Sequence, residues 1–161
     1  MSTSPSFDPT WRLRTADLDD AEHIAGAVQR LLVELDGTPG DLDSMTLATR
    51  ALIRHDELGV IFLAESDRAL IGLLAASWVH AIHVPGRYAL IQDLWVDPAW
   101  RSRDVGKALL IAISELARDH HFPRVEVGLP VESFAGFDAT LEFYLANDFQ
   151  RNGPRLRRLL S

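Results

Sequence analysis

The sequence predicts an α/β protein with one mixed β-sheet. Three observations carry this prediction: two long segments have the apolar spacing of amphipathic helices, two apolar runs flank a short polar turn, and a third strand-like run directly precedes the second long helix. The chain has 161 residues, of which 47% are hydrophobic, so it can bury one core. We expect residues 1–10 to be a flexible N-terminus and residues 11–161 to form a single domain.

The first third of the chain is predicted to hold a short strand and two helices. Residues 11–14 are typical of a strand. Apolar residues then recur every three or four positions over residues 18–35, after Thr15 and Asp17, either of which can cap the helix. A second, shorter helix is expected to begin at a Ser44 cap.

The middle of the chain is predicted to be an antiparallel meander. Residues 60–65 and 69–78 are apolar runs on either side of a three-residue polar turn, which is the pattern of a β-hairpin. After a second turn at Pro85 and Gly86, residues 88–96 are expected to form the next strand.

The last third begins with the strongest helix signal of the sequence, because apolar residues keep helical spacing from Val105 to about His120. A strand is expected over residues 125–129 and a helix over residues 138–147. Two short strand-like pieces in residues 149–160 would add to the sheet. The predicted order is therefore β-α-α-β-β-β-α-β-α-β, with one further short strand at the C-terminus.

Composition excludes several classes of protein. The chain contains no cysteine, which excludes a disulfide scaffold, a thiolate nucleophile and a cysteine-ligated metal site, and we expect no metal. Its net charge of −7 would repel nucleic-acid phosphates. The N-terminus lacks a secretory pattern, and no apolar stretch approaches the roughly 20 residues of a membrane span. We therefore expect a cytoplasmic protein without nucleic-acid or membrane partners.

The segment that joins the strand at residues 88–96 to the long helix carries the candidate site. Its loop contains Arg101, Ser102 and Arg103, and Gly106 lies in the first turn of the helix. A helix N-terminus leaves about four backbone N–H groups without partners and carries a partial positive charge, so it can bind phosphate groups. The alternative is that both arginines are solvated and Gly106 only allows close packing of the helix.

Two sequence patterns narrow this prediction. The run Arg101-Ser-Arg-Asp-Val-Gly106 follows a strand that ends in Val-Asp-Pro, and residues 142–149 read Glu-Phe-Tyr-Leu-Ala-Asn-Asp-Phe. They resemble the [R/Q]-x-x-G-x-[G/A] and F-Y-x-x-x-G-F motifs of the GCN5-related N-acetyltransferase (GNAT) family, and the resemblance covers about residues 11–160. It implies an acyl-CoA N-acyltransferase fold: a central, mostly antiparallel sheet that splays at its fourth strand, with helices on both faces.

The resemblance also implies that the chain uses acetyl-CoA as a co-substrate and needs no metal. The exposed backbone of Leu94, Trp95 and Val96 would hold the pantetheine arm. The diphosphate would lie against the loop and the first helical turn, whose residues are Arg101, Ser102, Arg103, Asp104, Val105, Gly106, Lys107 and Ala108.

Two positions depart from the family's pattern. Asp104 stands at the first glycine of the first motif, where its carboxylate would lie beside two phosphates unless it points to solvent or pairs with Arg101 or Arg103. At the start of the helix it is also placed to act as a cap. Asp148 stands at the glycine of the second motif, and aspartate tolerates a left-handed backbone better than most residues.

Tyr144 and Asp93 are the candidate catalytic residues. Tyr144 would donate a proton to the leaving CoA thiolate, and its alternative role is that of a core aromatic. Asp93 is the candidate base, although relatives often carry a glutamate at the Gln92 position, and Asp93 could instead bind the substrate ammonium or lie on the polar face of its strand. His80 and His83 are other candidate bases.

We therefore expect an N-acetyltransferase that moves the acetyl group of acetyl-CoA directly to an amine in a ternary complex. The acidic balance favours a cationic acceptor (a small amine, a lysine side chain or an N-terminal amine), and Glu34 and Asp36 could line its pocket. The alternatives are a catalytically degenerate acyl-CoA-binding sensor or interaction module, and an unrelated phosphoryl-binding domain. The alternating pattern of residues 155–160 suits an edge strand that could pair across a homodimer.

Overall fold

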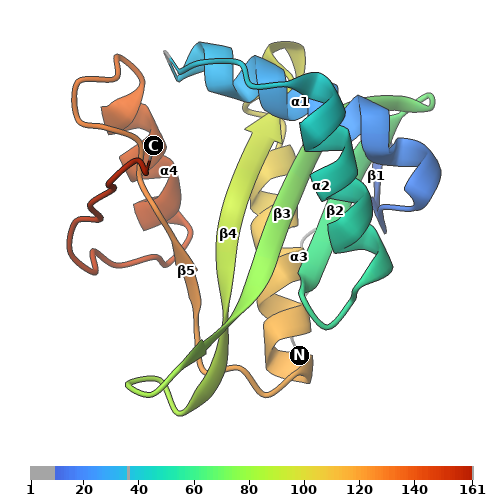
Figure 1. Cartoon of the computed structure of the whole chain (residues 1–161). Helices are drawn as coiled ribbons and strands as arrows, with labels where there is room; N and C mark the ends of the chain where they lie inside the picture. The colour runs from blue at the N-terminus through green and yellow to red at the C-terminus, as the bar shows by residue number, and fades with distance from the viewer. Residues whose placement is uncertain (1–9, 36, 161) are drawn as a thin grey trace.

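The computed structural model describes residues 10–35 and 37–160, so most of the predicted flexible N-terminus, and Asp36, lie outside the described residues. Its centre is a five-stranded sheet in the order β1-β2-β3-β4-β5 (Figure 1). The first four strands are antiparallel neighbours, and β5 runs parallel to β4. The strands are β1 (Arg12–Thr15), β2 (Gly59–Ser66), β3 (Ala69–Ala81), β4 (Gly86–Val96) and β5 (Val125–Val127).

Helices cover both faces of this sheet, which confirms the predicted mixed α/β class. Two short 3-10 turns, η1 (Leu18–Asp20) and η2 (Pro98–Trp100), precede the first and third helices. None of the helices in the described ranges has both the length and the apolar character needed to cross a bilayer. As Figure 1 shows, one face carries α1 (Ala21–Glu34) and α2 (Leu42–Arg54), the opposite face carries α3 (Val105–Asp119), and α4 (Phe137–Ala146) lies beyond β5.

Two apolar clusters, one on each face of the sheet, hold the layers together. Leu109 and Ile113 of α3 share a cluster with Leu74, whereas Ile24 of α1 shares the other with Leu73. Leu73 and Leu74 are neighbours in β3, and both are fully buried because successive side chains of a strand point to opposite faces. A strand covered on both faces is apolar throughout, which is why this part of the sequence is an unbroken apolar run.

The helix α2 begins earlier than the sequence predicts, whereas α1 begins three residues later, because residues 18–20 form η1. Asp17, one of the two expected caps, accepts a hydrogen bond from the Asp19 N–H at 2.9 Å and starts η1, which leads into α1. In α2 the cap is Asp41, whose carboxylate accepts a hydrogen bond from the Ser44 N–H at 2.8 Å. The expected Ser44 cap is therefore wrong, because Asp41 stands three positions earlier and provides the same acceptor.

β4 loses its second neighbour halfway along its length. β5 pairs with it only over residues 89–91, whereas β3 pairs with it along the whole strand. A β-bulge lies in the same place, with Gln92 as the additional residue between the partners of Ala75 and Ala76. Among the described residues, residues 92–96 thus have a neighbouring strand on one edge only, and the predicted splay at the fourth strand is confirmed.

The strands expected in residues 149–160 are wrong: these residues have no regular secondary structure, and residues 151–160 are all exposed. β5 is also shorter than predicted and ends at Val127. An alternating sequence becomes a strand only where a neighbour supplies hydrogen bonds, and three residues of β5 offer a short edge. The arginine-rich tail is consequently not part of the sheet.

Candidate active site

β4 leads through η2 and a short loop directly into α3. Four turn residues separate η2 from Val105, the first residue of the helix. Ser102 and Asp104 have φ angles of 62° and 64°, in the left-handed region that favours glycine. Aspartate is one of the few other residues that visit this region, so Asp104 can take the place of the motif glycine without changing the backbone.

The carboxylate of Asp104 does not cap α3. Asp104 occupies the N-cap position of α3, but its side chain makes no capping hydrogen bond. Within the described residues it is exposed and forms an ion pair with neither Arg101 nor Arg103. The prediction that Asp104 caps the helix is therefore wrong. Its carboxylate points to solvent and does not pair with either arginine.

The start of α3 presents a row of unpartnered backbone donors. In the described part of the chain, no acceptor reaches the N–H groups of residues 103–107. The Ala108 N–H donates to the Asp104 carbonyl oxygen at 2.9 Å, which excludes Ala108 from the predicted set of free donors. The side chains of Val105 and Ala108 are buried against the sheet, so they hold these donors in place.

Both loop arginines are engaged by protein groups, although both are exposed. Arg101 donates from Nη2 to Glu34 Oε2 at 2.5 Å and from Nε to the Val96 carbonyl oxygen at 3.1 Å. The Arg103 guanidinium lies 4.7 Å from the centre of the Trp100 ring. The prediction that they are merely solvated is thus wrong for Arg101, which joins the loop to the end of α1.

Gly106 has a packing reason that does not involve a ligand. A Cβ at this position would lie 3.0 Å from the Phe143 ring of α4 and 3.7 Å from Val96. Such a contact is tighter than side chains normally accept. The alternative role predicted for Gly106, close packing of the helix, is therefore present, with α4 as the main neighbour.

Tyr144 lies in the core, in the apolar cluster that also contains Val105, the first residue of α3. Its side chain is 7% exposed, and its ring is 5.2 Å from that of Phe143 and 5.3 Å from that of Phe149. Burial raises the pKa of Tyr144, so the phenol stays protonated at all ordinary pH values. Tyr144 thus has the packing of a core aromatic, which was its alternative role, and its hydroxyl is protonated.

Asp93 lies at the bulge of β4 and faces the α1 side of the sheet. It is opposite Ala75, which belongs to the α1-side cluster, and directly opposite residues point to the same face. No hydrogen bond or ion pair from another described residue reaches its carboxylate, and burial raises the pKa of Asp93. A carboxylate in this state can accept a proton or bind a cation.

A cavity of about 430 Å³ lies on the same face, between α1 and the end of β4. This is within the range of small-molecule sites. Trp95 lines it and is 2% exposed, and its indole Nε1 has no hydrogen-bond partner among the described residues. The other lining residues are Gly26, Gln29, Arg30, Val33, Glu34, Pro39 and Pro98.

Sequence reasoning identified Glu34 as a candidate pocket residue but missed Arg30. The Arg30 guanidinium lies over the Trp95 ring, 4.7 Å from its centre. The available signal was the spacing of Arg30 and Glu34, because positions four apart share one face of a helix. Asp36, the other acidic candidate, lies outside the described residues.

The two histidines predicted as alternative bases lie far from this site. His80 is opposite Arg87, whereas Gly72 is opposite Val96 at the other end of the same strand pair. Eight strand positions span roughly 27 Å. Asp93 is opposite Ala75, five positions or roughly 17 Å from His80, and His83 follows in the turn beyond β3. The structure therefore brings neither histidine together with Asp93 or with the start of α3.

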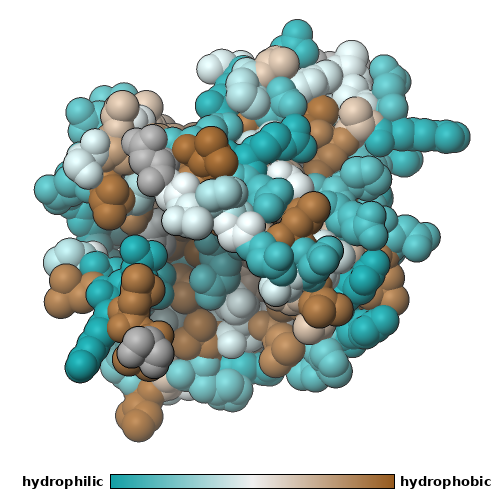
Figure 2. Space-filling view, turned by 45° about the horizontal axis from the view of Figure 1, so that its top comes forward, coloured by the Kyte–Doolittle hydropathy of each residue, from teal (hydrophilic) through white to brown (hydrophobic). Residues whose placement is uncertain are grey.

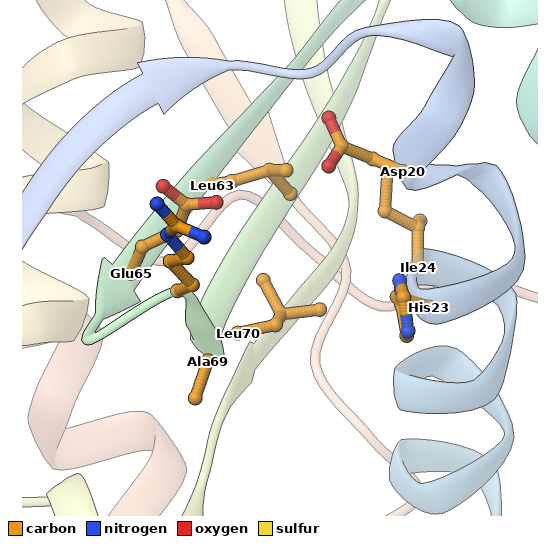
Figure 3. Close-up of a pocket in the computed structure, with 8 residues that line it drawn as sticks. Asp20, His23, Ile24, Leu63, Glu65, Ala69 and Leu70 are labelled. Carbon is orange, nitrogen blue, oxygen red and sulfur yellow. The ribbon is translucent and has the colours of Figure 1, made fainter.

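A second cavity, of about 160 Å³, lies beside the N-terminal end of α1 (Figure 3). The carboxylates of Asp20 and Glu65 lie at its wall, and Arg14 donates to both over 2.6 to 2.7 Å. These bonds lower the pKa of Asp20 and of Glu65. Both acids are thus engaged in an ion cluster, and this cavity is lined by none of the residues of the two motifs.

Comparison with known proteins agrees with this geometry. The family model described as the acetyltransferase (GNAT) family matches residues 16–150. No curated protein matches the sequence at a significant level.

Several solved structures share the fold at low sequence identity. A predicted acetyltransferase with acetyl-CoA from Clostridium acetobutylicum has a TM-score of 0.75 at 16% identity, over 92% of this chain and 96% of that chain. Aminoglycoside acetyltransferase AAC(6')-Iy, in complex with a bisubstrate analogue, has a TM-score of 0.76 at 19% identity, over 94% and 98%. A possible acetyltransferase from Clostridium difficile 630 has a TM-score of 0.74 at 18% identity, over 94% and 99%. Because the family model spans most of the sequence and the same fold surrounds both motifs, the chain belongs to the GNAT acetyltransferase family.

Proposed function

We propose that the chain is an acetyl-CoA-dependent N-acetyltransferase that transfers the acetyl group directly to an amine within a ternary complex. One observation carries the proposal: the free N–H groups of residues 103–107 lie next to the unpaired edge of β4. A diphosphate requires such a row of donors, and an extended pantetheine arm requires a free strand edge. Leu94, Trp95 and Val96 would supply that edge, on which the Val96 carbonyl oxygen already accepts a hydrogen bond from Arg101 Nε, and Arg101 to Lys107 would supply the diphosphate site.

The reaction requires that one proton leave the amine before attack, because an ammonium has no lone pair. Asp93 takes this proton. The amine nitrogen then forms a bond to the thioester carbonyl carbon, the C–S bond breaks, and the thiolate takes a proton from Tyr144. The second amine proton returns to the Tyr144 oxygen, so the products are an amide and a free thiol. A thiol has a pKa of about 8.5 and an ordinary phenol of about 10, and burial raises the pKa of Tyr144 further. Tyr144 is therefore a weak acid that keeps its proton until the thiolate forms.

The diphosphate site can be tested with a pair of variants at Lys107. Lys107→Pro removes one free N–H in the first helical turn, where proline is tolerated, whereas Lys107→Ala keeps the N–H and removes only the side chain. Calorimetric titration with acetyl-CoA should give an affinity at least tenfold weaker for Lys107→Pro than for Lys107→Ala. Equal affinities of two folded variants would show that the backbone donors do not bind the coenzyme.

Transfer itself is tested by thiol release from acetyl-CoA with a panel of small primary amines, a lysine peptide and a peptide with a free N-terminus. Release that depends on the amine supports the enzyme. The second candidate function is an acyl-CoA-binding sensor, which is favoured by the exposed Asp104 carboxylate in the diphosphate loop. It predicts tight binding without release by any amine.

Three further properties are part of the proposal: a single domain over residues 11–161, a cytoplasmic location and a homodimer. The surface in the view of Figure 2 is mostly polar, with hydrophobic side chains in small separate groups. Three leucines of the C-terminal tail, Leu156, Leu159 and Leu160, are between 80% and 99% exposed. Leucines so exposed favour a second copy as their cover.

A further inference from the structure

The cavity between α1 and β4 is lined by the positively charged side chain of Arg30, which forms an ion pair with no described residue. Arg30 lies on the face of Trp95, and no carboxylate among the described residues is within ion-pair distance of its guanidinium. Glu34, four positions further along α1, would be its usual helical partner, but Glu34 pairs with Arg101 instead. The cavity thus presents an uncompensated positive charge, in a chain whose net charge is −7.

An unpaired carboxylate lies on the same face of the sheet. Asp93 and Trp95 are two positions apart in β4, so both face α1, and they are separated by about 7 Å along the strand. Asp93 has no partner within the described chain. Asp93 is not among the residues that line the cavity, but it lies two positions from Trp95, which does line it. The α1 side of the sheet therefore presents a group that attracts a cation, Asp93, and a group that attracts an anion, Arg30.

We infer that the acceptor is an amine that also carries a carboxylate, with its amino group toward Asp93 and its carboxylate bound by Arg30. This rests on the proposed function and narrows it from amines in general to amino acids whose two charged groups are several bonds apart. A polyamine would bring a second positive charge toward Arg30 and would bind less well.

The position of Arg30 suits this role. A guanidinium presents its N–H groups in a planar fork that matches a carboxylate with two parallel hydrogen bonds. Stacking on a buried indole restrains the fork, so less side-chain entropy is lost when the carboxylate binds. Trp95 adds an indole N–H without a partner at the wall of the same cavity.

The test uses three amines of equal length: 6-aminohexanoate, hexylamine and 1,6-diaminohexane. Thiol release from acetyl-CoA gives kcat/KM for each amine with the wild type, Arg30→Gln and a control, Arg50→Gln, which changes an arginine of α2 that pairs with Glu22 on the surface. We expect the wild type to prefer 6-aminohexanoate at least tenfold over both other amines. Arg30→Gln should remove this preference by raising KM for 6-aminohexanoate, and its kcat/KM for hexylamine should stay within twofold of the wild-type value. Arg50→Gln should behave as the wild type with all three amines.

Other results overturn the inference. A wild type that prefers the diamine contradicts the inference. An equal loss of kcat/KM for all three amines in Arg30→Gln shows that Arg30 only supports Trp95. If no amine releases thiol, the proposed transfer fails, and the inference is then decided by calorimetry of the three amines with the CoA-bound protein. Binding of 6-aminohexanoate that Arg30→Gln abolishes supports it, and absent or unchanged binding refutes it.

Discussion

The hydroxyl of Tyr144 can be separated from the packing of its ring by a single substitution. Tyr144→Phe keeps the ring contacts with Phe143 and Phe149 and removes only the oxygen. We expect the melting temperature to change little and kcat to fall on the order of 10²-fold, with KM for acetyl-CoA unchanged, because a general acid contributes 10²-fold or more. An unchanged kcat would leave Tyr144 as a core aromatic only.

Asp93 makes opposite contributions to stability and to activity. Burial raises the pKa of Asp93, so the folded chain holds the proton more tightly than the unfolded chain, and the ionised carboxylate destabilises the fold at neutral pH. Asp93→Asn should therefore melt at a higher temperature than the wild type at pH 7. The difference should shrink as the pH falls through the raised pKa, because Asp93 is then neutral in the wild type too.

The same variant should lose activity, and most strongly below the pKa of the amine, where deprotonation of the acceptor is needed. Asp67→Asn, in the exposed turn between β2 and β3, is the matched control and should change neither the pH profile nor the melting temperature. A loss of activity that is uniform across pH would assign Asp93 to binding of the ammonium rather than to proton transfer.

Among the elements, Arg14 joins β1 to both β2 and the start of α1. It forms two hydrogen bonds of 2.7 Å with Asp20 and one of 2.6 Å with Glu65, and both acids are at least four-fifths buried. Arg14→Gln would leave Asp20 without its closest cation and Glu65 with the exposed Arg12 alone. We expect a loss of about 2 to 3 kcal/mol in the free energy of unfolding at pH 7, measured by urea denaturation.

The pH dependence of this loss follows from the direction of the pKa shifts. Because Arg14 lowers the pKa of Asp20 and of Glu65, its stabilising effect is complete above the ordinary carboxyl pKa of about 4 and disappears as the pH falls through the lowered values. Arg12→Gln is the control, since its side chain is 76% exposed and lies 3.5 Å from Glu65. A difference between wild type and Arg14→Gln that persists at pH 2 would contradict an ionic origin.

The elements that the sequence predicts well are those whose signal is local. The spacing of apolar residues in α3 and the polar turn between β2 and β3 lie within a few residues of one another, and both predictions are confirmed. Residues 149–160 have a strand-like alternation too, but a strand needs a partner that the sequence does not specify. The stack of Arg30 on Trp95 depends on how α1 crosses the sheet, so no local pattern predicts it.

At the scale of the whole molecule, the two faces of the sheet present different groups, and β4 contributes to both faces. The α3 side presents unpartnered backbone donors, whereas the α1 side presents a cavity with charged side chains. β4 contributes to both, because among the described residues no strand pairs with this edge beyond residue 91, and its side chains alternate between the faces. The ion pair between Glu34 and Arg101 links the two sides directly.

The C-terminal tail exposes three leucines, which the proposed homodimer would cover. β5 is the last strand of the sheet, and the Arg155 side chain lies close to Gly128, just after β5 ends, so the tail passes beside this edge.

Removal of residues 156–161 deletes three exposed leucines, which make little contribution to the core of their own chain. We expect the shortened chain to keep its melting temperature and to scatter light as a monomer of about 17 kDa, whereas the full chain forms a dimer. Arg157→Gln with Arg158→Gln is the matched control, which keeps the leucines and should still dimerise. A full chain that is monomeric at roughly 100 µM, or a shortened chain that still dimerises, would rule out the tail as the contact between copies.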